Sequence, residues 1–196
     1  SFTPSQPQRA VVAGGYANVL VMDYFEITTL GNAADFGDLT NSAGGMRNGC
    51  GSSTRGIFFG GGDEANSLDK LQYITLASTG NATNFGNMST EKKEPMSVSN
   101  GTRAISAGTV SDYNNTLEYV TIASVGNTTD FGDMNSSQVV ATGHGAASTT
   151  RGLLGGGYKS GPTGLTNFIQ YLTIGSTGDT VDFGDLTVSR MKQAGF

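Results

Sequence analysis

The chain of 196 residues lacks tryptophan and has one cysteine, Cys50, and one histidine, His144. A lone cysteine excludes an internal disulfide framework and leaves the redox compartment open. A single Cys and a single His also exclude most zinc and copper sites, which are built from several such ligands. We therefore expect Cys50, which lies between two glycines, to pack as a small apolar residue.

Charge is also scarce, because only 14% of the residues are charged, with 11 Lys and Arg against 16 Asp and Glu. This mild acidity, without a basic stripe, argues against nucleic acid as a partner. No apolar run approaches the roughly 20 residues that span a bilayer, so membrane insertion is not expected. No secretory signal is visible, and the start at Ser1 is compatible with a processed product or a piece of a longer chain.

The chain contains 30 glycines and one sequence pattern that is repeated four times. Each copy has a tyrosine-centred apolar segment, a Gly-Asn or Gly-Asp pair, and an Asp-Phe-Gly-Asp or Asn-Phe-Gly-Asn motif. The repeated aromatics are Tyr24, Tyr73, Tyr119 and Tyr171, followed by Phe36, Phe85, Phe131 and Phe183. The phenylalanines are 49, 46 and 52 residues apart, a period typical of β-propeller blades.

The repeat predicts four short strands. An arginine opens an apolar run that ends in glycines, which indicates a buried strand, at Arg9, Arg55, Arg103 and Arg151. The tyrosine strand is apolar on both faces and should be covered on both sides. We expect a tight turn at each Gly-Asn or Gly-Asp pair (Gly31, Gly80, Gly126 and Gly178). The Asp-Phe-Gly-Asp strand should be short and outermost, and the variable stretch after it, such as 92–101, supplies the fourth strand.

We expect the copies to fold only as a stacked set. Four large side chains per copy give gross burial of roughly 1.5–3 kcal/mol each, whereas ordering the backbone costs about 1–2 kcal/mol per residue. The predicted fold is therefore all-β, a propeller of four four-stranded antiparallel blades forming one domain over 1–196. Its repeats cover approximately 9–54, 55–102, 103–150 and 151–196, with 1–8 completing the last blade.

Closure of the ring is predicted from the lengths between motifs. From the Leu or Met after the Asp-Phe-Gly motif to the next repeated Arg takes 16, 15 and 17 residues, and the two chain ends together supply 19. Pairing of the two termini would therefore close four blades, the smallest usual number. The alternative is a partial ring cut from a larger propeller, or four blades that meet another chain.

The strand ending in Gly-Gly, followed by a Tyr-bearing strand and a single aromatic, resembles kelch-type propellers, although kelch blades usually carry Trp where this chain has Phe. The strings Tyr-Ile-Thr-Leu, Gly-Asn-Ala-Thr-Asn-Phe-Gly-Asn and Thr-Arg-Gly-Ile-Phe-Phe-Gly-Gly-Gly are similar to repeats in tail-fibre or virion-surface proteins of marine bacteriophages. The similarity covers roughly residues 9–190. It implies a repeat type and a virion-surface or extracellular location, and not a chemistry.

Two repeated features are candidate sites. The acids of Asp35-Phe-Gly-Asp38 and its counterparts could offer oxygen ligands to Ca²⁺, but two per blade are few, and a turn or strand-end role is favoured. The repeated arginines could form an anion-binding ring. We instead expect each arginine to pair with an acid of the Asp-Phe-Gly-Asp strand in its own blade. We expect no metal and no cofactor. The glycine triplets lack the Lys-Ser/Thr of a phosphate loop and should permit a sharp strand exit and close blade packing.

The segments that differ most between copies are 16–21, 63–69, 109–116 and 158–167. Propellers usually place recognition on such divergent loops. Tyrosines there offer stacking surfaces for sugars, and polar residues offer hydrogen bonds. The predicted ligand-binding residues are Tyr16, Asn18, Asp63, Glu64, Asn66, Asp112, Tyr113, Asn114, Tyr158 and Lys159.

Three function classes fit these observations. The favoured hypothesis is a non-enzymatic recognition or structural module of a phage virion surface or tail fibre, which attaches to a host-surface glycan or another virion protein. The second is an intracellular kelch-like scaffold for protein interactions. A propeller hydrolase is the weakest, because only His144 could serve as a histidine base and no motif marks a nucleophile.

Overall fold

The computed structural model describes residues 9–15, 19–40, 48–62, 67–109, 114–135, 144–158 and 164–192. Within these ranges the chain folds into four antiparallel sheets of consecutive strands, here called blades 1 to 4. Blade 1 has three described strands and each other blade has four. The predicted all-β architecture of four antiparallel blades is therefore confirmed, apart from a fourth strand in blade 1, which is not among the described residues.

The strands follow one order in every blade, from the inner strand to the outer. Blade 1 consists of β1 (Arg9–Ala13), β2 (Val21–Glu26) and β3 (Ala34–Asp38). Blade 2 consists of β4 (Asn48–Gly51), β5 (Arg55–Phe59), β6 (Leu68–Thr75) and β7 (Thr83–Lys92). Blade 3 consists of β8 (Met96–Ser99), β9 (Arg103–Ala107), β10 (Thr116–Thr121) and β11 (Thr129–Asp133). Blade 4 consists of β12 (His144–Ala147), β13 (Arg151–Tyr158), β14 (Leu165–Thr173) and β15 (Val181–Asp185).

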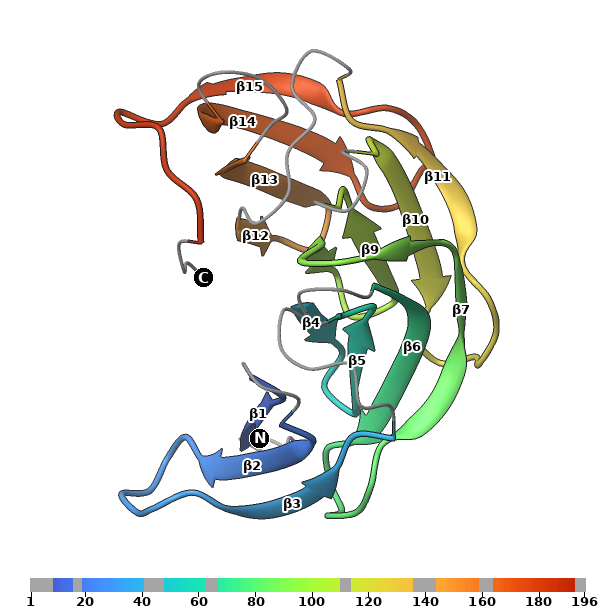
Figure 1. Ribbon diagram of the computed structural model, residues 1–196, viewed down its shortest axis with the longest axis vertical. Helices are drawn as coiled ribbons and strands as arrows, with labels where there is room; N and C mark the ends of the chain where they lie inside the picture. Colours follow the sequence, from blue (N-terminus) through green and yellow to red (C-terminus); the bar gives the residue numbers. More distant parts are fainter. Residues whose placement is uncertain are drawn as a thin grey trace, which may run out of the picture.

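The blades are arranged along an arc around a common axis, with the short strands β4, β8 and β12 toward the centre and β3, β7, β11 and β15 on the rim (Figure 1). The arc occupies more than half of a ring and is open between blade 1 and blade 4 (Figure 1). Closure of the ring is not shown, and residues 1–8, which were predicted to complete the last blade, lie outside the described residues.

A β-bulge recurs at the same place in all four blades. In blade 2, Leu71 pairs with Gly86 and Gln72 pairs with Asn84, so Phe85 is the extra residue of the outer strand. The same register shift leaves out Phe36, Phe131 and Phe183 in the other blades. Because a bulge redirects the side chain of its extra residue, the repeated phenylalanine points to the repeated tyrosine instead of alternating with its neighbours.

The core lies between the blades. One cluster joins blades 1 and 2 around Met22 and Phe36, a second joins blades 2 and 3 around Ile57 and Phe85, and a third joins blades 3 and 4 around Phe131. The repeated tyrosines of the first three blades are partly buried and pack against these clusters. The prediction that tyrosine strands are pressed between neighbouring copies is therefore confirmed at all three junctions.

Candidate functional site: the blade junctions and the loop end

Each blade carries the same stack of three side chains. The guanidinium carbon of the repeated arginine lies 4.6 Å from the ring centre of the tyrosine in its own blade, in all four copies. That tyrosine meets the repeated phenylalanine edge to face, at 5.9, 5.8, 5.8 and 6.2 Å between ring centres from blade 1 to blade 4. Cation–π and T-shaped contacts of this kind are favourable, so the stack is a local unit that each copy builds for itself.

The arginine also connects its blade to the next one. Nη1 of Arg9 donates to the Leu76 carbonyl at 3.2 Å, and Nη1 of Arg55 donates to the Ile122 carbonyl at 3.0 Å. Nη1 of Arg103 donates to the Ile174 carbonyl at 3.2 Å. These carbonyls occupy one repeat position, directly after the tyrosine strand. Arg9, Arg55 and Arg103 are therefore junction residues, which agrees with a structural role.

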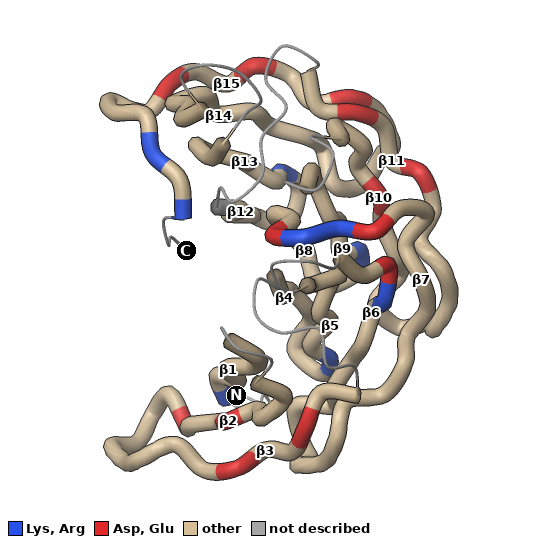
Figure 2. Tube along the Cα trace, viewed as in Figure 1, with Lys and Arg blue, Asp and Glu red and all other residues tan. Residues whose placement is uncertain are grey.

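The predicted pairing of the arginines with the outer-strand acids is wrong. Nε of Arg9 donates to Oε1 of Glu26 at 2.8 Å, on the neighbouring strand β2, and this hydrogen bond raises the pKa of Arg9. Figure 2 shows acidic residues along the outer strands and basic residues on inner strands. The outer strand lies two strand spacings from the arginine strand, about 10 Å, so the stacked guanidinium is held away from those carboxylates.

The Gly-Asn pair forms the second connection between blades. The Gly80 N–H donates to the Phe36 carbonyl at 2.7 Å, and Oδ1 of Asn81 accepts the Asp38 N–H at 3.0 Å. The same two bonds join blade 2 to blade 3 and blade 3 to blade 4. The predicted tight turn is thus wrong at Gly80, because the turn lies earlier, where the Ser78 N–H donates to the Thr75 carbonyl.

The glycine of Asp-Phe-Gly allows this close approach. A Cβ on Gly37 would lie 2.5 Å from the Gly80 carbonyl, and one on Gly86 would lie 2.1 Å from the Gly126 carbonyl oxygen. Both glycines also have a positive φ, +136° and +157°. The triplet of blade 2 ends the arginine strand sharply as predicted, since Gly60 has a φ of +54° and a Cβ there would meet the Lys92 carbonyl at 2.3 Å. In blade 4 the prediction is wrong, because β13 continues through its triplet to Tyr158 with a register shift between Gly155 and Gly157.

The acids of the same motif lie on the surface. Asp35 is exposed, and its Oδ1 accepts the Gly37 N–H at 3.1 Å, as expected for a strand-end role. Within the described ranges no group of three or more His, Cys, Asp or Glu side chains is placed to hold a metal ion.

A third connection uses the residue before each tyrosine. Oε1 of Gln72 accepts the Thr40 N–H at 2.6 Å, and Oε1 of Gln170 accepts the Asn135 N–H at 3.1 Å. At this position blade 3 has a carboxylate, Glu118, whose Oε1 accepts the Ser89 N–H at 2.8 Å. All three acceptor side chains are buried. The sequence shows Gln, Glu and Gln at one repeat position, but nothing in it identifies them as junction residues.

Glu118 has a buried counter-ion. Nζ of Lys92 lies 3.2 Å from Oε2 of Glu118 and donates to the Thr116 carbonyl at 2.9 Å, with both charged side chains at most 2% exposed. Burial acts to raise the pKa of the Glu118 carboxyl, but the Lys92 ammonium and hydrogen bonds from Ser89 and Thr128 outweigh it, so the pKa lies below its ordinary value. Sequence reasoning missed this pair because Lys92 is found in one copy only.

The described residues line two clefts between neighbouring blades. One of about 430 Å³ separates blades 2 and 3 at the end that carries Arg55, and hydroxyl side chains of Ser52, Thr54 and Thr102 line it. Another of about 320 Å³ lies between blades 1 and 2 and reaches Cys50. Sγ of Cys50 donates to the Val98 carbonyl at 3.5 Å, and burial raises the pKa of the thiol to about 11. Cys50 therefore packs against apolar residues, as predicted.

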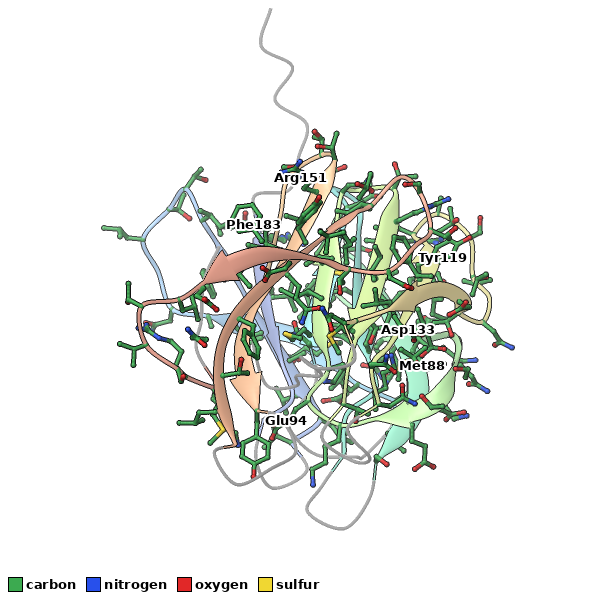
Figure 3. The ribbon with its side chains drawn as sticks, turned by 90° about the horizontal axis from the view of Figure 1, so that it is seen from above. Met88, Glu94, Tyr119, Asp133, Arg151 and Phe183 are labelled. Atoms are coloured by element: carbon green, nitrogen blue, oxygen red, sulfur yellow. The ribbon has the colours of Figure 1, made fainter. Side chains whose placement is uncertain are left out.

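The predicted recognition segments follow the arginine strands and precede the tyrosine strands in the chain, so the described residues that flank them lie at the other end of the blades. In Figure 3 this end, marked by Glu94, lies opposite the end that carries Arg151. Of the predicted ligand-binding residues, only Asn114 and Tyr158 lie within the described ranges. Tyr158 is half-buried at the end of β13, and Oδ1 of Asn114 accepts the Thr116 N–H at 2.7 Å. The others lie outside the described residues: Tyr16, Asn18, Asp63, Glu64, Asn66, Asp112, Tyr113 and Lys159.

No family model matches the sequence, and no curated protein matches it. Among solved structures, 127 chains match. One is described as "Structure of YjhT", with a TM-score of 0.71 and 10% sequence identity, covering 94% of this chain and 67% of that one. At this identity the likeness shows the fold alone, an all-β propeller-like arrangement of blades. In the part of the chain that the structure describes, we find no helix with the length and apolarity to cross a membrane.

Proposed function

We propose that this chain is a non-enzymatic recognition and structural module of a phage virion surface or tail fibre, which binds a host-surface glycan or another virion protein. The proposal rests on the observation that the residues repeated in every copy hold the blades together. The junctions between blades are formed by the repeated arginine, tyrosine, phenylalanine and Gly-Asn pair. The residues that differ between copies are not part of these contacts and can therefore serve recognition. The proposal takes the blades as kelch-like and the ring as closed in the working protein.

The loop end has chemistry that suits a glycan. Tyr113 and Tyr158 belong to segments that differ between copies, and tyrosine stacks on the apolar face of a sugar while its hydroxyl hydrogen-bonds. Asn114 already holds the start of β10 through the Thr116 N–H, which supports a role in shaping its loop. On the rim, Figure 2 shows acidic residues at more places than basic ones, which favours a neutral glycan over an anionic one.

The test is a glycan-array screen of the purified chain, repeated with Tyr113→Ala and Tyr158→Ala. We expect binding that falls about tenfold or more in each variant, because each replacement removes a stacking contact of about 0.5–1.5 kcal/mol together with a hydrogen bond of about 0.5–1.5 kcal/mol. Tyr113→Phe and Tyr158→Phe keep the ring and separate stacking from hydrogen bonding. Melting curves of all variants show whether the fold is retained.

A stable protein partner in pull-down together with an empty glycan array would favour the kelch-like interaction scaffold instead. Glycan binding that survives both alanine variants would move the site away from these loops. Hydrolysis of a bound glycan would contradict the non-enzymatic assignment.

A further inference from the structure

The two ends of the arc each present one half of the junction that is made three times within the chain. Among the described residues, 12 large hydrophobic side chains are exposed, of which 11 belong to blades 1 and 4 and only Val125 to the blades between them. The end faces are therefore unusual for this protein, and the internal junctions show what chemistry fits each one.

Blade 4 presents the half that donates. Phe183 is 51% exposed, whereas Phe36, Phe85 and Phe131 are at most 3% exposed in their junctions. Arg151 stacks on Tyr171 like its counterparts, but the described residues give its guanidinium no carbonyl of a next blade. A Cβ on Gly184 would meet nothing within 4 Å. Arg151, Phe183 and Gly184, whose counterparts enter the junctions of blades 1 to 3, are therefore present here without a following blade among the described residues.

Blade 1 presents the half that accepts. Phe25 and Ile27 are 41% and 66% exposed, whereas their counterparts in blade 3, Val120 and Ile122, are 3% and 2% exposed. The amides of Gly80, Gly126 and Gly178 each donate to a carbonyl of the preceding blade, whereas the described residues place no preceding blade beside Gly31. Asp23 occupies the repeat position of Gln72 and is exposed.

These two faces are complementary to each other but are held apart on opposite sides of the opening (Figure 1). A second four-blade copy does not fit, because the arc fills more than half of the ring and the opening is smaller than the arc (Figure 1). The share of the YjhT structure that this chain covers indicates the number of blades required. This chain covers 67% of it, so about a third of that chain, equal to about two repeats of this one, has no counterpart here.

We propose that the two end faces dock a pair of further blades of this same repeat, continuous with the chain, which complete a six-blade ring. The first added blade supplies a backbone carbonyl to Arg151 and a Gly-Asn or Gly-Asp pair to Gly184. The second supplies an arginine for the Ile27 carbonyl, a phenylalanine over Phe25 and a backbone N–H for Asp23. Every junction among the described residues joins blades that are consecutive in the chain, which is why a covalent continuation is favoured over a separate partner.

The test compares the 196-residue chain with the same chain extended at its carboxyl end by a copy of its own residues 48–135, which carry two blades. Hydrogen exchange is followed at the Gly31 and Ala33 amides, the counterparts of Gly80 and Ala82, which donate to blade 1. We expect exchange at Gly31 and Ala33 to be about tenfold slower or more in the extended chain, because new hydrogen bonds protect them, while Gly80 and Ala82 change little.

Arg151→Ala, with Arg55→Ala as the matched control, provides the second measurement. We expect Arg151→Ala to leave the melting temperature of the 196-residue chain nearly unchanged and to lower that of the extended chain by about 2–4 °C or more, whereas Arg55→Ala lowers both. Equal exchange at Gly31 in the two chains would overturn the proposal. A large loss of melting temperature on Arg151→Ala in the 196-residue chain would also overturn the proposal. Analytical ultracentrifugation would then separate two alternatives: a monomer would indicate that the four blades close on themselves, and a dimer would indicate that a second copy covers the end faces.

Discussion

Phe131 and Phe183 occupy one repeat position and make the same contact with their own tyrosine, at 5.8 and 6.2 Å between ring centres. Phe131 is 2% exposed and Phe183 is 51% exposed. The bulge and the stack are therefore local products of the repeat, whereas burial depends on whether a next blade is present. An inner copy and an end copy can differ widely in energy with nearly the same sequence.

The largest expected effect is that of Phe131→Ala. It removes a buried ring from the cluster between blades 3 and 4 and should lower the free energy of unfolding by about 3–5 kcal/mol. Phe183→Ala removes a half-exposed ring and should cost less than about half of that. Urea denaturation followed by circular dichroism measures the free energy of unfolding of both variants. Equal losses would show that burial by a next blade does not distinguish inner copies from end copies.

The second comparison is between Glu118 and the glutamines at its repeat position. Lys92→Ala leaves a buried carboxylate without its counter-ion and should cost about 3–5 kcal/mol. The double variant Lys92→Met, Glu118→Gln copies the neutral arrangement at Gln72 and Gln170 and should be nearly neutral or stabilising. A double variant as unstable as Lys92→Ala would mean that the charges themselves are needed at this junction.

The same pair predicts a pH dependence. Because the pKa of Glu118 in the folded protein lies below its ordinary value, the stabilisation is complete above the unfolded value of about 4.3. This stabilisation is lost as the pH falls from the unfolded pKa through the lower pKa of the folded protein, because the carboxyl is then protonated in both states. Unfolding midpoints in urea between pH 6 and pH 3 should fall more steeply for the original chain than for the double variant; parallel curves would contradict this.

A smaller difference is expected between Gly86→Ala and Gly184→Ala. Both positions have a positive φ and share the backbone strain of about 1–3 kcal/mol. Only at Gly86 would the new Cβ also meet a neighbouring blade, at 2.1 Å from the Gly126 carbonyl oxygen. We therefore expect Gly86→Ala to be the more destabilising of the two in thermal melts. A larger loss of melting temperature for Gly184→Ala than for Gly86→Ala would show that blades 2 and 3 can separate at Gly86 without losing stability.

The smallest expected effect concerns one hydrogen bond. Asn81→Ala removes the acceptor of the Asp38 N–H and should cost about 0.5–1.5 kcal/mol. Asn32 is its counterpart in blade 1, where the structure describes no preceding blade, and Asn32→Ala should be neutral within about 0.5 kcal/mol. Chemical denaturation of the two variants side by side resolves this difference.

Much of the fold could be predicted from the repeat. The order of the four strands, the rim position of the Asp-Phe-Gly-Asp strand and the stacking of tyrosine strands all follow from apolar patterning and glycine positions that are repeated in each copy. The arginine partners could not be predicted, because a carbonyl of the next blade has no signature in the sequence. The Gly80-Asn81 pair was misread for the same reason. Glycine and asparagine are typical of tight turns, but here the pair lies against the backbone of the preceding blade and hydrogen-bonds to it.

The candidate site was predicted less completely. The variable segments were identified by their differences between copies, but only Asn114 and Tyr158 of the proposed ligand-binding residues lie in the described part. The buried Lys92–Glu118 pair and the hydroxyl-lined cleft beside Arg55 are products of packing. No local pattern reveals them, because their members come from different strands or different blades.

By itself, the sequence determined the blade: its strands, its bulge, and the stack of arginine, tyrosine and phenylalanine, all of which depend on residues close together in one copy. Only the tertiary structure decided which of those stacks is buried, which carbonyl each arginine binds and which two faces are left uncovered. The physical reason is that a blade covers its apolar faces only with its neighbours, and the number of neighbours is a property of the assembled arc.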